Sequence, residues 1–197
     1  MNYVVISDTD IIVHMVKGNI FFEVIPIILD KVYITPKVEE ELKNKHAGIY
    51  YQLLPIFVQG KWLFKAKDMW KLLTDDQRIM INQTREKHRA RLDPGELDCL
   101  AFATGLGIHA IISDDRGAKE IISEVTENQK VIITFWDLLI MGAKKDRIPW
   151  SVAEEYYQRV RLACLPKHPD FKYQIGLFEK NILPHPWVQH YLNSSNR

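Results

Sequence analysis

The sequence predicts an α/β protein, a three-layer α/β/α sandwich with a central, mostly parallel sheet, followed by a helical or irregular C-terminal extension. Three short β-branched runs carry this prediction: Tyr3–Ile6, Ala110–Ile112 and Val131–Ile133. None of them alternates apolar with polar residues, which is typical of strands that are buried on both faces beneath helices. Helical stretches separate the runs, and such alternation favours a parallel sheet.

The remaining elements follow from the spacing of apolar residues between these strands. Residues Val32–Thr35 predict a fourth strand. Five stretches have helical character: Ile11–Asp30 with a turn at Gly18 and Asn19, Pro36–Lys45, Asp76–Arg91, Pro94–Thr104 and Gly117–Glu124. The chain therefore alternates strands and helices up to about residue 148.

The last quarter of the chain differs in composition from the rest. Four of the nine prolines and a set of aromatic residues lie after residue 150, and only Ser151–Leu165 has a helical pattern. Fewer than ~50 residues rarely hold a core alone. We therefore divide the chain into a domain of residues 1–148 and an extension of residues 149–197 that packs on the domain or on a partner.

Composition and charge exclude several classes of protein. The two cysteines, Cys99 and Cys164, have no ligand or disulfide spacing, so a disulfide scaffold and a zinc ribbon are not expected and a reducing, cytoplasmic compartment fits. We expect no secretory signal, because the N-terminus lacks a basic region, and no membrane partner, because no apolar run approaches ~18 residues. The net charge of +1 argues against nucleic acid only if acids and bases are evenly mixed.

The acids are in fact concentrated near the predicted strand ends and helix starts. They fall into four clusters: Asp8 and Asp10, Glu39 to Glu41, Glu96 and Asp98, and Asp114 and Asp115. The carboxyl ends of parallel strands meet at one edge of a sheet, so three of these clusters are expected there. Clustered carboxylates repel one another unless cations hold them, and oxygen-only ligands favour Mg²⁺ or Mn²⁺ over zinc.

Helical geometry narrows the choice among the three consecutive glutamates. At 100° per residue, Val38 and Leu42 define the apolar stripe and Glu40 points away from it. Glu39 and Glu41 flank the stripe on either side. Spacing alone does not choose between these two.

Each acidic cluster also has a purely structural interpretation. The segment Asp93–Glu96 resembles a capping box, with a proline at the first helical position. Asp114 or Asp115 can cap the helix from Gly117, and Asp8 or Asp10 can cap the helix that follows the first strand. Convergence of all four clusters on one region favours a functional site over four independent caps.

Four segments together resemble the PIN-domain family of metal-dependent nucleases. They are Val4–Asp10, Thr35–Leu42, Gly95–Ala103 and Ile111–Arg116, in the order in which the family has them. The resemblance spans about residues 1–148. The segment His46–Arg91 is longer and richer in aromatic residues than a compact member of the family needs, and the extension after Arg147 has no counterpart in the family.

The resemblance implies an acidic catalytic site and a metal ion. It places Asp8, Glu41, Glu96 and Asp115 in that site and so selects Glu41 over Glu39. As metal ligands it offers Asp8, Glu96, Asp98, Asp114 and Asp115, with the choice between Asp114 and Asp115 open. The activity it implies is Mg²⁺- or Mn²⁺-dependent hydrolysis of phosphodiester bonds, with RNA favoured over DNA. An endoribonuclease of the toxin type, with an antitoxin protein or a second copy of the chain as partner, is one form of this hypothesis.

Cationic side chains near the acids are candidates for contacts with phosphates. Arg85, Arg89 and Arg91 precede the helix of Glu96, and Arg116 and Lys119 follow Asp115. The first three can equally complement the dipole at the end of a helix. Arg116 is favoured because it adjoins the predicted site.

Two other functions compete with the nuclease hypothesis. Asp8 and Asp10 also resemble the D-x-D motif of haloacid-dehalogenase-type phosphohydrolases, with Asp8 as nucleophile and Asp10 as acid or base. That interpretation leaves Glu41 and Glu96 without roles. The third alternative is a non-catalytic PIN-like module that binds RNA or a metal.

Overall fold

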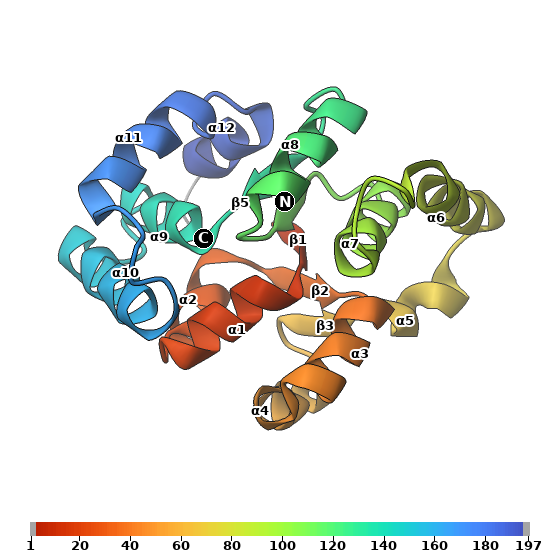
Figure 1. Cartoon of the computed structure of the whole chain (residues 1–197), viewed down its shortest axis with the longest axis horizontal. Helices are drawn as coiled ribbons and strands as arrows, with labels where there is room; N and C mark the ends of the chain where they lie inside the picture. Colours follow the sequence, from red (N-terminus) through yellow and green to blue (C-terminus); the bar gives the residue numbers. More distant parts are fainter. Residues whose placement is uncertain (1–2, 195–197) are drawn as a thin grey trace.

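The computed structural model describes residues 3–194 and has a five-stranded, all-parallel sheet at its centre (Figure 1). The strands are β1 (Val4–Ser7), β2 (Lys31–Ile34), β3 (Leu63–Lys65), β4 (Ala110–Ile112) and β5 (Val131–Ile133). Their order across the sheet is β3-β2-β1-β4-β5. In the centre Ile6 lies in register between Tyr33 and Ile111. The predicted α/β class and parallel sheet are confirmed.

Residues 3–194 form twelve α-helices. They are α1 (Thr9–Lys17), α2 (Phe21–Ile28), α3 (Pro36–Lys45), α4 (Ala47–Gln59), α5 (Ala66–Met69), α6 (Asp75–His88), α7 (Pro94–Gly105), α8 (Arg116–Val125), α9 (Phe135–Lys144), α10 (Trp150–Cys164), α11 (Phe171–Asn181) and α12 (Pro186–Asn193). The predicted helix over Pro36–Lys45 has the observed bounds, and the predicted turn at Gly18 and Asn19 separates α1 from α2. Asn19 takes a positive φ of 54° there, a conformation that asparagine tolerates better than most residues.

One strand and two helices of the segment 46–91 escaped sequence-based prediction. The edge strand β3 has no β-branched residue to mark it, unlike β4 and β5, and it follows a helix with Pro55 in its interior. Its partner is β2, with Val32 opposite Leu63. This extra strand places Lys65 at the carboxyl ends of the strands, where Asp8 also lies.

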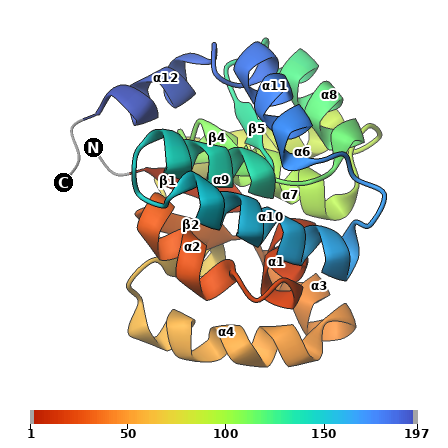
Figure 2. The same ribbon diagram turned by 90° about the vertical axis from the view of Figure 1, so that its left-hand side faces the viewer.

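Helices cover both faces of the sheet. Helix α7 packs on β1 and β4 and carries α6 outside it, while α1, α2, α9 and α10 contact one another on the other side. Figure 2 shows α2, α9 and α10 in front of the strands with α6 and α7 behind them. The arrangement is consistent with a three-layer sandwich.

Helix α10 packs against α1 and α9, and α11 packs against α9. Tyr157 is fully buried, and its ring stacks on Phe135 with 5.7 Å between ring centroids. Phe178 and Tyr191 are also fully buried. Residues 195–197 of the predicted extension lie outside the described residues.

None of the helices within residues 3–194 has the length and apolar character needed to cross a membrane.

Candidate active site

Asp8 occupies the turn between β1 and α1, at the carboxyl edge of the sheet. It is the N-cap of α1: its Oδ1 accepts a hydrogen bond from the backbone N–H of Thr9 at 2.8 Å. Its Oδ2 accepts one from Ser113 Oγ, at the end of β4, at 3.1 Å. The residue is 7% exposed. Burial raises the pKa of Asp8 to about 7 despite these hydrogen bonds, and the nearby charges of Asp10 and Asp93 contribute to the rise.

Glu41 reaches the same place from helix α3. Thr9 Oγ1 donates to its Oε2 at 2.8 Å, and Lys45 Nζ donates to its Oε1 at 2.6 Å. The hydrogen bond from Lys45 is the main cause that lowers the pKa of Glu41 below its ordinary value. Glu41 is therefore an ionised carboxylate next to Asp8.

Gly95 provides the space into which three carboxyl groups point. A Cβ atom at Gly95 would lie 3.5 Å from Asp93 Oδ1, 3.6 Å from Asp8 Oδ1 and 3.7 Å from Glu41 Oε2. These oxygens come from three different elements: the start of α7, the start of α1 and the middle of α3. Because residue 95 is a glycine, no side chain fills the space among these three oxygens.

Glu96 both caps helix α7 and lies in the acidic cluster, the two alternatives that the sequence left open. Asp93 Oδ1 accepts from the backbone N–H of Glu96 at 2.9 Å, and Glu96 Oε2 accepts from that of Asp93 at 3.3 Å, so the capping box is present. Burial raises the pKa of Glu96 to about 7, and the charges of Asp93, Asp115 and Asp10 add to the rise. The same carboxyl group caps a helix and belongs to an acidic cluster.

Asp115 adds a further carboxyl group, close enough for its charge to raise the pKa of Glu96. It is the N-cap of α8, and its Oδ1 accepts from Ala118 N at 2.9 Å. Ser113 Oγ donates to Asp8 and accepts from the backbone N–H of Asp115 at 3.2 Å, so one hydroxyl links the two strand ends. We call these five carboxyl groups the acidic site: Asp8, Glu41, Asp93, Glu96 and Asp115.

The two other acids offered as ligands are engaged elsewhere. The Oδ2 of Asp114 contacts His14 Nδ1 at 2.7 Å, and its Oδ1 accepts from Phe135 N at 3.1 Å. The Oδ1 of Asp98 accepts from Arg85 Nε at 2.8 Å, and its Oδ2 accepts from Lys37 N at 3.2 Å. Both carboxylates join neighbouring helices, and neither is part of the acidic site.

The predicted phosphate-binding cations differ in their surroundings. Arg85 pairs with the buried Asp98, Arg91 pairs with Glu124 at 2.6 Å, and Arg89 pairs with Glu86 at 3.4 Å. Arg116 and Lys119 lie in the first turns of α8, directly after Asp115, and within residues 3–194 neither forms an ion pair. The charge of Lys119 acts on the buried Asp137: burial raises the pKa of Asp137, and Lys119 partly offsets this rise.

The acidic site offers only carboxylate oxygens as donors, and Mg²⁺ and Mn²⁺ prefer oxygen ligands. Within the described chain no three His, Cys, Asp or Glu side chains are close enough together to hold a metal ion directly. Mg²⁺ commonly retains several waters and binds only one or two carboxylates directly. Burial is the main cause that raises the pKa values of Asp8 and Glu96, the charges of neighbouring acids add to the rise, and a cation bound here would favour the ionised forms. Asp8, Glu41 and Asp93 are the residues that would hold it.

A cleft of about 270 Å³ opens beside these oxygens. Its lining consists of residues from α3 and from the start of α7: Lys37, Glu40, Glu41, Asn44, Lys45, Asp93, Pro94 and Gly95. Glu40 is exposed, as helical geometry predicts. Two residues of the acidic site, Glu41 and Asp93, line this cleft.

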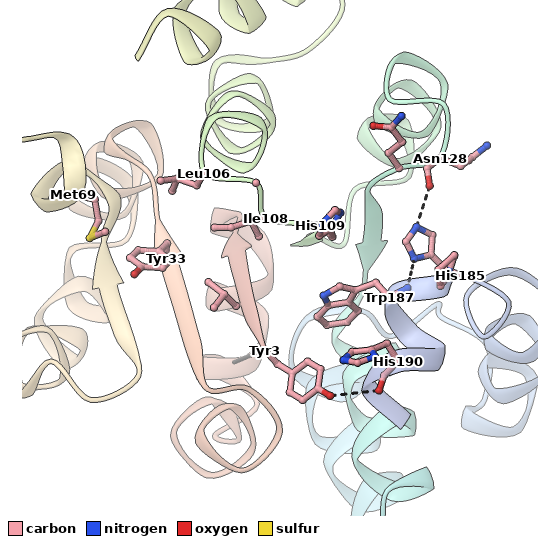
Figure 3. A pocket seen from close by; sticks show the side chains of 14 residues that line it. Tyr3, Tyr33, Met69, Leu106, Ile108, His109, Asn128, His185, Trp187 and His190 are labelled. Carbon is pink, nitrogen blue, oxygen red and sulfur yellow. Dashed lines mark hydrogen bonds between the residues drawn. The ribbon is translucent and has the colours of Figure 1, made fainter. Parts of the chain in front are cut away.

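A larger cavity lies at the opposite edge of the sheet, where the strands begin. It measures about 700 Å³, and Tyr3, Tyr33 and Trp187 give it an aromatic lining (Figure 3). His185 donates from Nε2 to Asn128 O at 3.0 Å and accepts at Nδ1 from Trp187 N at 3.2 Å. No Asp or Glu is among the described residues that line it, so it lacks the groups for carboxylate-supported hydrolysis.

Sequence reasoning missed several participants in the acidic site. Asp93 was interpreted only as a helix cap, and the hydroxyls of Thr9 and Ser113 carry no signal of their own. Gly95 was the sequence feature that could have indicated this site, because glycine allows other groups to approach the backbone closely.

No protein-family model, no curated protein and no solved structure matches this chain. The geometry of the acidic site is therefore the basis on which a function can be proposed.

Proposed function

We propose that this protein is a Mg²⁺- or Mn²⁺-dependent nuclease that hydrolyses phosphodiester bonds, with RNA as the favoured substrate. The observation that carries the proposal is the convergence of Asp8, Glu41 and Asp93 on Gly95. Glu96 and Asp115 stand beside them. This arrangement is suited to cation-supported phosphoryl chemistry, and it includes four acids that the resemblance to PIN-domain nucleases selects.

Four of the five residues of the acidic site have a chemical role in this proposal. Asp8, Glu41 and Asp93 would hold a divalent cation, which would supply activation of a water and neutralisation of charge on the leaving oxygen. Thr9 and Ser113 fix the rotamers of Glu41 and Asp8 through their hydroxyl groups. Glu96, with a pKa of about 7, is partly ionised at neutral pH and accepts the proton of the attacking water.

Arg116 and Lys119 supply positive charge for the scissile phosphate. Both follow Asp115 on α8, and neither forms an ion pair with a carboxylate of the described residues. Charge-assisted hydrogen bonds from such side chains position a phosphate and offset its repulsion by the carboxylates.

A substrate panel tests the proposal. With Mn²⁺ the purified protein is expected to cleave single-stranded RNA, more slowly single-stranded DNA, and not a small phosphomonoester such as p-nitrophenyl phosphate. EDTA is expected to abolish cleavage, and the Asp8→Asn variant serves as the blank for contaminating nucleases. Equal cleavage of every substrate by wild type and by the Asp8→Asn variant would refute the proposed enzymatic activity. Metal-dependent turnover of the monoester alone would favour the phosphohydrolase alternative.

A further inference from the structure

Three lysines converge on one buried carboxylate beside the acidic site. Glu39, on α3, has a side chain that is 4% exposed. Its oxygens accept from Lys43 Nζ at 2.8 Å, from Lys65 Nζ at 2.9 Å and from Lys67 Nζ at 2.7 Å. Tyr50 OH donates to the same carboxylate at 2.8 Å. We call Lys43, Lys65 and Lys67 the lysine cluster.

The lysine cluster carries more positive charge than its carboxylate can balance. Burial opposes the ionisation of Glu39, but the hydrogen bonds from the lysines and Tyr50 outweigh it and hold its pKa well below the ordinary value. The hydrogen bond to Glu39 raises the pKa of Lys43. One negative and three positive charges therefore meet, and within residues 3–194 no other carboxylate pairs with these lysines.

The ammonium groups are available to an external ligand. The side chains of Lys43 and Lys67 are 44% and 46% exposed. Each ammonium has three N–H donors; Glu39 takes one from each, and Tyr50 OH accepts a second from Lys65 at 3.1 Å. Because Glu39 holds them in place, less side-chain entropy is lost when they bind an anion.

The lysine cluster lies at the same sheet edge as the acidic site. Lys65 ends β3 and Lys67 is the second residue of α5, which lies next to the start of α3 (Figure 1). Glu39 and Glu41 flank the buried stripe of α3 on opposite sides. The lysine cluster and the acidic site are thus separated by the width of this one helix.

We propose that the lysine cluster binds a backbone phosphate of the nucleic acid whose neighbouring bond is cut at the acidic site. This inference depends on the proposed nuclease function. A phosphate at Lys43, Lys65 and Lys67 would supply the missing negative charge, and it would anchor the chain across α3 a few nucleotides from the scissile bond. Recognition is of the phosphodiester backbone, so it does not discriminate among bases.

The test measures binding without catalysis. Fluorescence anisotropy follows a labelled single-stranded RNA in EDTA over a range of KCl concentrations, for wild type and for the Lys43→Gln/Lys67→Gln variant. Lys65 is kept so that Glu39 stays paired and the fold is maintained. Each lost phosphate contact lowers the slope of log K against log salt by about 0.7 for single strands, so we expect a decrease of about 1.4. At 0.1 M KCl this corresponds to roughly a tenfold or greater loss of affinity.

A matched variant controls for the change in net charge. Lys172 and Lys180 are exposed residues of α11, which lies away from α3 and β3 in Figure 1. The Lys172→Gln/Lys180→Gln variant loses the same two charges and is expected to keep the wild-type slope within error. Single-stranded DNA, which has the same backbone charge, is expected to depend on the lysine cluster in the same way. Circular dichroism melting curves verify that each variant is folded.

The outcomes separate this inference from the proposed function. Wild-type affinity and slope in the Lys43→Gln/Lys67→Gln variant would overturn the lysine site, as would absence of RNA binding by wild type at 50 mM KCl. Cleavage with an unchanged KM in this variant would also overturn it, while the nuclease would stand. Binding that depends on the lysine cluster without any metal-dependent cleavage would uphold the site and refute the nuclease.

Discussion

Replacing Asp8 with asparagine is expected to lower kcat for Mn²⁺-dependent RNA cleavage by about 10³-fold, which corresponds to about 4 kcal/mol of transition-state stabilisation. The amide keeps the shape of the carboxyl group but cannot carry its negative charge. Asp8 is the acid whose oxygen faces both Asp93 and Glu41 across Gly95. The measurement is single-turnover cleavage of a labelled RNA at saturating enzyme.

The same substitution should leave the fold intact. Asparagine is as good an N-cap as aspartate, so the hydrogen bond from Thr9 N to position 8 can be kept. Ser113 Oγ can accept from the new amide where it now donates. Removing a buried charge also removes its desolvation cost, so the stability of Asp8→Asn above pH 7 should equal or exceed that of wild type.

Asp114→Asn is the matched control at the neighbouring strand end. Asp114 contacts His14 and Phe135 instead of the acidic site. We expect its kcat to stay within about threefold of wild type, a change of less than 1 kcal/mol. A wild-type rate in Asp8→Asn, or equal damage by the two substitutions, would contradict the assignment of the site.

Replacing Arg85 with methionine is expected to destabilise the protein by about 3 kcal/mol, because it leaves the buried Asp98 unpaired. The Asp98 side chain is 4% exposed, and Arg85 Nε donates to it at 2.8 Å. Its other oxygen receives only the backbone N–H of Lys37. Urea denaturation followed by circular dichroism measures the free energy of unfolding.

The double variant Arg85→Met/Asp98→Leu distinguishes a structural pair from a nucleic-acid contact. Replacing both partners by apolar residues often restores most of the stability lost on breaking a buried pair. Salt-dependent RNA binding by this double variant should match wild type if Arg85 serves the fold. A stable Arg85→Met variant with weakened RNA binding would show that Arg85 contacts phosphate, as its sequence context alone suggested.

Much of the fold was predictable because its signals are local. The β-branched runs mark β1, β4 and β5, and the proline at position 36 after Thr35 marks the start of α3. β3 was not predictable, because its three residues, Leu63–Lys65, include no β-branched residue and obtain their conformation from pairing with β2. Tertiary contacts, and not intrinsic propensity, decide such elements.

The acidic site was predictable in its location and only partly in its membership. Topology brings strand ends together, so Asp8 and Asp115 could be assigned to one edge from the sequence. Helical spacing could not choose between Glu39 and Glu41. In the structure Thr9 donates a hydrogen bond to Glu41, whereas lysines from β3 and α5 pair with Glu39. Partners far apart in the chain, such as Arg85 and Asp98 or Lys67 and Glu39, leave no local pattern.

Calorimetric titration of the protein with Mn²⁺, without nucleic acid, tests most directly whether the acidic site binds a divalent cation. Asp8 and Glu96 have pKa values of about 7, so both are mostly protonated at pH 6 and mostly ionised at pH 8.5. Metal binding favours the ionised form and therefore releases protons where the free groups still hold them. Titrations in two buffers of different ionisation enthalpy measure the number released.

We expect saturable Mn²⁺ binding with release of between about one and two protons at pH 6 and far fewer at pH 8.5. The Asp8→Asn variant should bind more weakly and release about one proton fewer at pH 6, because its amide does not titrate. Absence of saturable binding, or proton release that is the same at both pH values and in both proteins, would contradict a metal-binding acidic site at the carboxyl edge of this sheet.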